Sequence, residues 1–325
     1  MFGYILRRIL YMIPILLGVN ILTFSLFFVV NTPDDIARAQ LGQKYVTKGA
    51  IQAWKHQHGY DLPLFINEEM QGASKLTQTI FYQKSLSLFT FDFGFSDAGR
   101  DITYDVSQRM WPSLAIAVPS LVLELTLNIS IALLIIFFRN TYLDTFGVVA
   151  CVMLMSISAL FYIIAGQYFI AKLLKLVPIS GYVPGWHLFK FLILPIAIGV
   201  FSGIGMGVRW YRTLFLEEIN KDYVRTARAK GLKESVILFR HVLGNALIPI
   251  LTGVVAILPL LFMGSLLLES FFGIPGLGSY TIDAIGQQDF AIVRAMVFLG
   301  SVFYIIGLLL TDISYTLVDP RVRLE

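Results

Sequence analysis

The residue types that most often carry chemistry are few in this chain, and their spacing does not suit catalysis. The four histidines, His56, His58, His187 and His241, do not form the HExxH pattern of helical zinc sites, and no GxxxxGK[ST] phosphate-binding loop is present. Ser202 has glycine at positions 199 and 203, one residue too far apart for a rhomboid-type GxSG, so we interpret it as a packing residue. Cys151 is the only cysteine, which excludes a disulfide within the chain. We expect no catalytic residue and no metal site.

Acidic residues inside apolar segments are the remaining candidates. Glu124 lies in the middle of a long apolar run, whereas Glu269 and Asp312 lie nearer the ends of theirs. Ionisable groups inside a membrane are costly and are functional candidates by default. Glu124 could form an interhelical hydrogen bond or face a cavity, or it could take a direct part in substrate passage. The sequence leaves these alternatives open.

The apolar runs themselves indicate an all-α integral membrane protein. Of the 325 residues, 57% are hydrophobic and 14% are charged, with a mean hydropathy of +0.74. Roughly 20 apolar residues are needed to cross a bilayer as a helix. Continuous runs of this length favour helices over a membrane barrel. Six such runs predict six transmembrane helices, at Ile9–Val30, Ser113–Phe138, Phe146–Leu174, Phe189–Trp210, Leu247–Leu268 and Ile292–Leu317. The first is longer than a signal-peptide core and lacks a cleavage pattern, so we expect it to be retained.

Basic residues near the ends of these runs predict the orientation. The side predicted to be cytoplasmic carries Arg7, Arg8, Arg139, Arg209, Arg212, Lys221, Arg225, Arg228, Lys230, Lys233, Arg240, Arg321 and Arg323. The short loops of the other side carry only Lys172, Lys175, Lys190 and Arg294. We therefore expect both termini in the cytoplasm and a large periplasmic segment over residues 31–112. The expected organisation is residues 1–30 as the first helix, 31–112 as the periplasmic segment and 113–325 as the core.

The polar stretch between the fourth and fifth runs, about residues 211–246, has an unusual composition. Thr226, Ala227 and Ala229 are small and precede Gly231, which predicts a short helix that ends in a left-handed turn. An exposed helix with a small-residue face suits docking into a cleft of a partner protein. A basic amphipathic segment lying on anionic headgroups is the alternative.

The sequence of this stretch, DYVRTARAKGL, resembles the EAA loop of bacterial ABC importer permeases, in the variant of the dipeptide/oligopeptide branch. In that family the loop forms a coupling helix that docks on a cytoplasmic ATPase. The resemblance implies this ATPase-coupling role for Asp222, Tyr223, Arg225, Thr226, Ala227, Arg228, Ala229, Gly231 and Leu232.

Further matches follow in order along the chain. Gly59–Leu64 resembles the family's GLDxPL element, Phe91–Ser96 its GDFGxS element, and Val177–Gly181 its LPxSG element. Gly264 through Gly278 matches GxxxxExxFxxPGxG, and Asp319–Arg323 matches DPRxR. We name as translocation or gating candidates Glu124, Glu269, Pro275, Gly276 and Gly278. Asn67–Leu88 has no clear family counterpart, and the loop around Tyr182–Trp186 is short, so the surface facing a binding protein is the least constrained part.

The resemblance implies a bacterial inner-membrane permease, and it also implies the partners. They are a second homologous permease, two ABC ATPases that bind ATP and Mg²⁺, a periplasmic substrate-binding protein and membrane lipid, with no nucleic acid and no cofactor on this chain. The implied cargo is peptide. Nickel complexes or other small solutes carried by the same architecture are the nearer alternative, and an ion-coupled secondary carrier is the more distant one.

Overall fold

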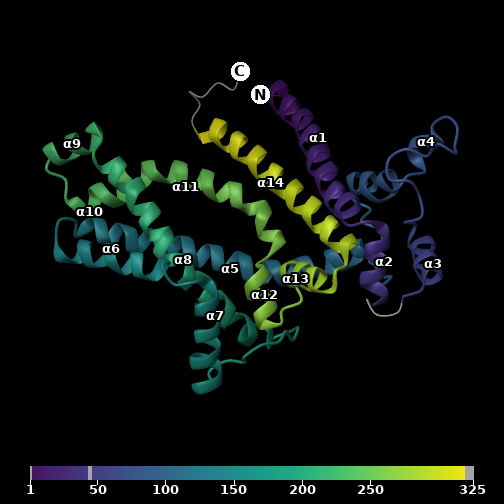
Figure 1. The fold of residues 1–325 in the computed structure, drawn as a ribbon. Helices are drawn as coiled ribbons and strands as arrows, with labels where there is room; N and C mark the ends of the chain where they lie inside the picture. Colours follow the sequence, from purple (N-terminus) through teal and green to yellow (C-terminus); the bar gives the residue numbers. More distant parts are fainter. Residues whose placement is uncertain (1, 43–45, 319–325) are drawn as a thin grey trace. The chain divides into compact units, whose positions relative to one another are not determined.

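The computed structural model describes residues 2–42 and 46–318, and within them the named secondary-structure elements are all helices (Figure 1). The Asp319–Arg323 match lies outside these residues. One isolated β-bridge joins Phe95 and Asp101. The chain divides into two compact units. One comprises residues up to 110 together with 280–309, and the other comprises residues 111–279 and 310–318.

The first unit begins with α1 (Phe2–Ser25), which continues into the π-helical turn η1 (Leu26–Val30). After it come the short helices α2 (Pro33–Leu41), α3 (Lys48–His58), α4 (Ser74–Thr77), η2 (Phe81–Ser85) and η3 (Leu86–Thr90). Thr32 and Asp35 form a capping box at the start of α2, and Gly59 ends α3 with a positive φ of 69°.

Two helices from the C-terminal part of the chain contribute to the same unit. They are α13 (Leu277–Gln287), from Tyr280 onward, and α14 (Phe290–Val318), as far as residue 309. Figure 1 shows α14 beside α1, and the rings of Phe27 and Phe290 are 5.2 Å apart. A buried core that includes Phe24, Phe28 and Trp54 joins α1, η1, α2 and α3. Residues at the start and near the end of the sequence therefore pack together.

The second unit contains most of α5 (Ile102–Phe137), followed by α6 (Tyr142–Met155), α7 (Ala159–Gly166), η4 (Gln167–Leu173) and α8 (Leu188–Ile219). Beyond the carboxyl end of α8 come α9 (Asp222–Ala229), α10 (Glu234–Val236), η5 (Ile237–Val242), α11 (Leu243–Ile257), η6 (Leu258–Met263) and α12 (Leu266–Phe272). Helices α6 and α8 approach closely, since a Cβ placed on Gly205 would lie 2.6 Å from the Cys151 carbonyl oxygen.

Five helical segments are long and apolar enough to cross a membrane, and a sixth is possible if the bent pair α6 and α7–η4 counts as one span. The prediction of a membrane protein made of long apolar helices is confirmed. Three helical segments extend well beyond the predicted spans. Helix α5 begins at Ile102, before Ser113, and α8 continues beyond Trp210 to Ile219. The segment that contains the predicted span Leu247–Leu268 runs from Glu234 to Phe272.

The third predicted span, Phe146–Leu174, is not one helix. Helices α6 and α7 meet at an angle of 86°. Ser158 adopts an extended conformation, with φ −63° and ψ 144°, and starts α7. At the break the Leu154 carbonyl accepts hydrogen bonds from the Ile157 N–H, at 3.3 Å, and from the Tyr162 hydroxyl, at 2.7 Å. The run was predicted as one span long enough to be tilted or to end in an interfacial turn, whereas the bend lies inside it, before Ala159.

Candidate functional site

The predicted coupling helix is α9, and its end has the predicted geometry. Gly231 has a φ of 76°, and its N–H donates to the Arg228 carbonyl at 2.9 Å. The Leu232 N–H donates to the Ala227 carbonyl at 3.3 Å. These two bonds form a Schellman motif, which needs a left-handed residue at the glycine position. The predicted short helix and its left-handed turn are confirmed.

Helix α9 is anchored to the carboxyl end of α8. Val224 and Ala227 are buried in a core with Phe215 and Ile219 of α8. Glu218, also on α8, accepts a hydrogen bond of 2.7 Å from the Tyr223 hydroxyl. Burial, followed by this contact, raises the pKa of Tyr223 to about 12. Glu218 also pairs with Lys221, so one carboxylate holds both the approach to α9 and its first turn.

The other predicted coupling residues face outward. They are Asp222, Arg225, Thr226, Arg228, Ala229, Gly231 and Leu232. Arg228 donates to both carboxylate oxygens of Glu234, from Nε at 3.2 Å and from Nη2 at 2.5 Å. This fork closes the turn around Gly231. The small residues on the exposed face are therefore Thr226 and Ala229, whereas Ala227 packs into the core of its own unit.

Glu269 and the glycines of the PGxG element form a second site, around a buried carboxylate. Glu269 accepts hydrogen bonds from the backbone N–H groups of Ser265 and Ser279, both at 3.1 Å. The Gly278 N–H and the Ser113 hydroxyl also donate to it. Cβ atoms placed on Gly264 and Gly276 would lie 1.9 and 2.2 Å from its oxygens. These glycines are required because the carboxylate occupies the space of their side chains, and the arrangement fixes the turn between α12 and α13.

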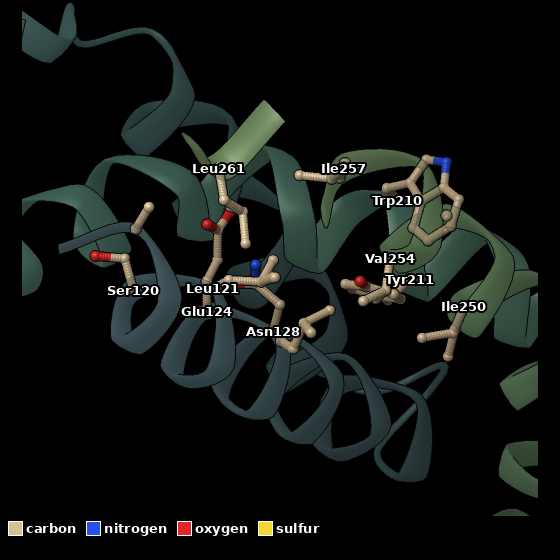
Figure 2. Close-up of a pocket in the computed structure, with 13 residues that line it drawn as sticks. Ser120, Leu121, Glu124, Asn128, Trp210, Tyr211, Ile250, Val254, Ile257 and Leu261 are labelled. Carbon is tan, nitrogen blue, oxygen red and sulfur yellow. The ribbon is translucent and has the colours of Figure 1, made fainter. Parts of the chain in front are cut away.

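The predicted translocation or gating candidates thus lie at two different sites. The structure brings Glu269, Gly276 and Gly278 together in this cradle, with Pro275 exposed beside them. Glu124 does not belong to the cradle. It lines a cavity of about 380 Å³ between α5, the end of α8, α11 and η6 (Figure 2).

Glu124 belongs to a polar ladder on α5 that sequence reasoning found only in part. Ser120, Glu124 and Asn128 are spaced by four residues and therefore share one face of the helix. Opposite them, α8 presents Gly199, Gly203 and Gly207 at the same spacing. Cβ atoms at these glycines would lie 3.6 Å from Ser120 Oγ, 2.3 Å from Glu124 Oε1 and 2.0 Å from Asn128 Nδ2, respectively.

Ser120 and Asn128 were missed by sequence reasoning. The signal that could have found them is the four-residue spacing, which occurs in both helices. Among the α8 glycines, Gly205 allows the close approach of α6, whereas Gly203 and Gly207 make room for Glu124 and Asn128.

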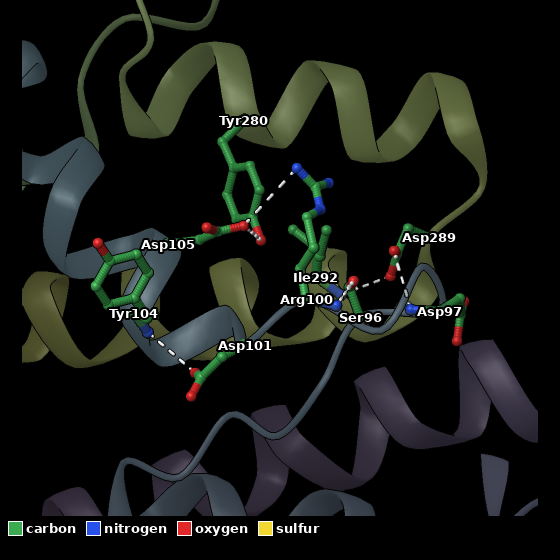
Figure 3. A network of polar contacts seen from close by, with 9 residues as sticks. All are labelled: Ser96, Asp97, Arg100, Asp101, Tyr104, Asp105, Tyr280, Asp289 and Ile292. Atoms are coloured by element: carbon green, nitrogen blue, oxygen red, sulfur yellow. Dashed lines mark hydrogen bonds and ion pairs between the residues drawn. The ribbon is translucent and has the colours of Figure 1, made fainter. Parts of the chain in front are cut away.

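The first unit holds a third polar site, which was also missed (Figure 3). Asp289 accepts a hydrogen bond from the Ile292 N–H at 3.2 Å, as the cap of α14, and another from the Asp97 N–H at 3.1 Å. The Tyr60 hydroxyl lies 3.4 Å from Asp97 Oδ1. Burial, reinforced by the nearby Asp289 carboxylate, raises the pKa of Asp97 to about 6.

Basic groups neighbour these carboxylates. Arg294, 5% exposed, donates to the Lys84 carbonyl at 3.4 Å and lies 4.9 Å from the ring centre of Phe28. A cavity of about 370 Å³ is lined by Tyr60, Lys84, Asp97 and Arg294, among others.

A separate contact joins the Tyr280 hydroxyl to Asp105 at 3.2 Å. Within the described residues, no cluster of three or more His, Cys, Asp or Glu side chains could hold a metal ion.

Comparison with known families shows which family this chain belongs to. Residues 110–324 match the binding-protein-dependent transport system inner membrane component family, and residues 1–85 match the N-terminal region of the same kind of membrane component. The chain belongs to this family. It is a permease subunit of an ABC importer rather than an enzyme, and ATP hydrolysis lies with partner ATPases. This membership sets aside the self-sufficient ion-driven carrier.

Full-length relatives carry peptide-related names. A protein of Brucella abortus that is provisionally named a peptide transport system permease is 32% identical, over 100% of both chains. The dipeptide transport system permease of Bacillus subtilis is 30% identical, over 99% of this permease and 98% of the relative. The glutathione transport system permease of Salmonella paratyphi A is 29% identical, over 99% of both chains.

Proposed function

We propose that this permease is one of two homologous membrane subunits of a peptide importer, and that α9 is the helix that docks on a partner ATPase. The names of the full-length relatives support peptide as the cargo. The observation that carries the docking role is the construction of α9. One face is fixed to α8 by Val224, Ala227 and Tyr223, and the other presents Thr226 and Ala229 outward.

This construction suits the transmission of force between an ATPase and the membrane. Helix α8 is continuous from Leu188 to Ile219, carries α9 at its end and lines the Glu124 cavity with Trp210 and Tyr211. A displacement of α9 would move the wall of that cavity. Nucleotide can shift such an equilibrium only through different affinities for its two states, and α9 is the contact at which that difference would act.

The proposed arrangement places α9 and both termini in the cytoplasm and segment 31–112 in the periplasm, where a substrate-binding protein would deliver peptide. Six crossings of the inner membrane satisfy this orientation if α6, α7 and η4 together make one of them. The proposed complex includes a second permease and two ABC ATPases that hold ATP and Mg²⁺.

The docking role can be tested by a bulky charge on the exposed face of α9. We expect Thr226→Arg to abolish ATP-dependent uptake of peptide in vesicles that contain the whole complex, while the permease still inserts. The matched control is Thr145→Arg, since Thr145 is also an exposed threonine of the second unit, on α6. Normal uptake by Thr226→Arg, at a normal membrane level, would contradict the role. Ala227 is unsuitable for this test because a large residue there would disturb the core.

A further inference from the structure

The cavity beside Glu124 has an unusual chemical character, since the polar atoms that lack partners there can accept hydrogen bonds. Asn128 is 1% exposed, and its amide donates to Glu124, while its Oδ1 atom has no hydrogen-bond partner. The buried Ser120 Oγ also lacks a partner. Among the described residues that line this cavity, none is Lys, Arg or His. The Glu124 carboxylate therefore has no cationic neighbour in the lining.

An isolated carboxylate in an apolar surrounding is costly unless it is neutralised or pairs with a cation. A buried carbonyl oxygen without a donor adds a further cost. Both costs are removed by one ligand group that carries a positive charge and several N–H donors. A primary ammonium has three donors and no acceptor, which matches the oxygens of Ser120, Glu124 and Asn128 on α5.

The aromatic residues of the cavity support the same assignment. Trp210 and Tyr211 belong to its lining, and Figure 2 shows them on the α8 side, across from the α5 ladder. Ring faces attract an ammonium group, most strongly when water is excluded. The remaining lining is aliphatic and includes Ile250, Val254 and Leu261. An apolar wall of this kind accepts side chains of many shapes, whereas the polar ladder recognises one charged group.

We infer that Glu124, Asn128 and Ser120 form a binding site for a primary ammonium group, which the proposed function identifies as the protonated amino terminus of the peptide in transit. This inference rests on the proposed function for the identity of the cargo. It assigns to this permease a selectivity for free amino termini that is separate from any selectivity of the binding protein. The glycines Gly203 and Gly207 give the site its space, because any side chain there would displace Glu124 or Asn128.

The test measures equilibrium binding of radiolabelled trialanine to the purified complex of permeases and ATPases without the binding protein. Acetyl-trialanine, which lacks the ammonium group, is the competitor. We expect the wild type to bind trialanine at least roughly tenfold more tightly than the acetylated form, since hydrogen bonds to charged groups are the stronger class. In Glu124→Gln this ratio should fall to about one. Glu124→Asp, which keeps the charge, should retain part of it. Thr126→Val is the control, because Thr126 lies on the exposed face of α5.

Some results would overturn the inference. The wild type could bind the two peptides with equal affinity, or it could bind neither of them. The affinity ratio could also stay unchanged in Glu124→Gln. A further result also counts against it: failure of Glu124→Gln to copurify with the second permease would show that Glu124 serves the assembly of the two permeases rather than ligand binding. A separate measurement tests the proposed function: uptake by the wild-type complex of trialanine that is delivered by the binding protein. If uptake is present without discrimination, only the inference fails, whereas absent uptake would remove the peptide assignment itself.

Discussion

At the scale of single residues, Glu269 shows how a buried charge can serve structure rather than transport. Its four donors satisfy the carboxylate, and an amide in its place would turn an NH₂ group toward N–H donors. A buried donor without a partner costs about 1–3 kcal/mol. We expect Glu269→Gln to lower the thermal unfolding midpoint of the detergent-purified permease and to reduce its amount in membranes. The exposed Glu217→Gln should leave both unchanged. Equal stability of the two variants would show that Glu269 is not needed for the turn.

Asp97 gives a residue-scale prediction of pH dependence. Burial and Asp289 raise its pKa in the folded protein from 3.8 to about 6, while Arg294, His58 and Lys84 act in the opposite direction. The folded state thus binds this proton more tightly than the unfolded state. The stabilising contribution is fully present below about pH 4 and is lost as the pH rises through about 6. We expect the unfolding midpoint of the wild type, relative to Asp97→Asn, to fall between pH 4.5 and 7. A difference that stays constant, or rises with pH, would contradict the assignment.

The acidic residues also show what sequence reasoning reaches at this scale. The position of Glu124 inside an apolar run was enough to select it, because membrane interiors disfavour charge. The same argument selected Glu269, but its four donors, three of them backbone N–H groups, come from α5, the start of α12 and α13. Asp97 and Asp289 were not selected, since they stand in polar stretches and are 192 residues apart. Only the fold brings them together.

At the scale of elements, α8 contains glycines at positions where helix propensity alone would favour alanine. Alanine is more favourable than glycine inside a helix by roughly 1 kcal/mol. At Gly207, however, the added Cβ would lie 2.0 Å from Asn128 Nδ2, and overpacking typically costs about 1–3 kcal/mol. We expect Gly207→Ala to lower the unfolding midpoint. Gly244→Ala on α11 has no atom within 4 Å of the new Cβ and should leave the midpoint equal or higher. A rise for both variants would mean that Asn128 moves away without cost.

The elements themselves were predictable where one local signal dominated. Long apolar runs located most of the long helices, and the small residues before Gly231 predicted both α9 and its left-handed end. Apolar composition did not predict where a helix continues into a polar segment or bends within an apolar one. Helix α5 starts at Ile102 and continues through Pro112, which was expected to end the polar segment before the second span. The 86° bend between α6 and α7 is bridged by the hydrogen bond from the Tyr162 hydroxyl to the Leu154 carbonyl, and no periodicity reveals such a contact.

At the scale of the whole molecule, the grouping of segments was beyond sequence reasoning. Segment 31–112 was predicted as a periplasmic segment, with no prediction of what it packs against. The structure packs residues 2–110 with residues 280–309, through contacts such as Phe89 with Phe298 at 5.2 Å between ring centres. Apolar side chains that face lipid and those that face another helix have the same composition. The pattern therefore finds the helices but not their neighbours.

Orientation in the membrane is the whole-molecule property that the distribution of Lys and Arg predicts, and the single cysteine makes it measurable. Cys151 is buried, so a Cys151→Ala background should label weakly or not at all with a membrane-impermeant maleimide. In that background we expect Gln71→Cys to react in intact spheroplasts and Ser235→Cys to react only after the membrane is opened. Both positions are exposed, so a difference in their labelling reports the side of the membrane on which each one lies. Labelling of Ser235→Cys in intact spheroplasts would reverse the predicted orientation, and it would place α9 where no cytoplasmic ATPase could reach it.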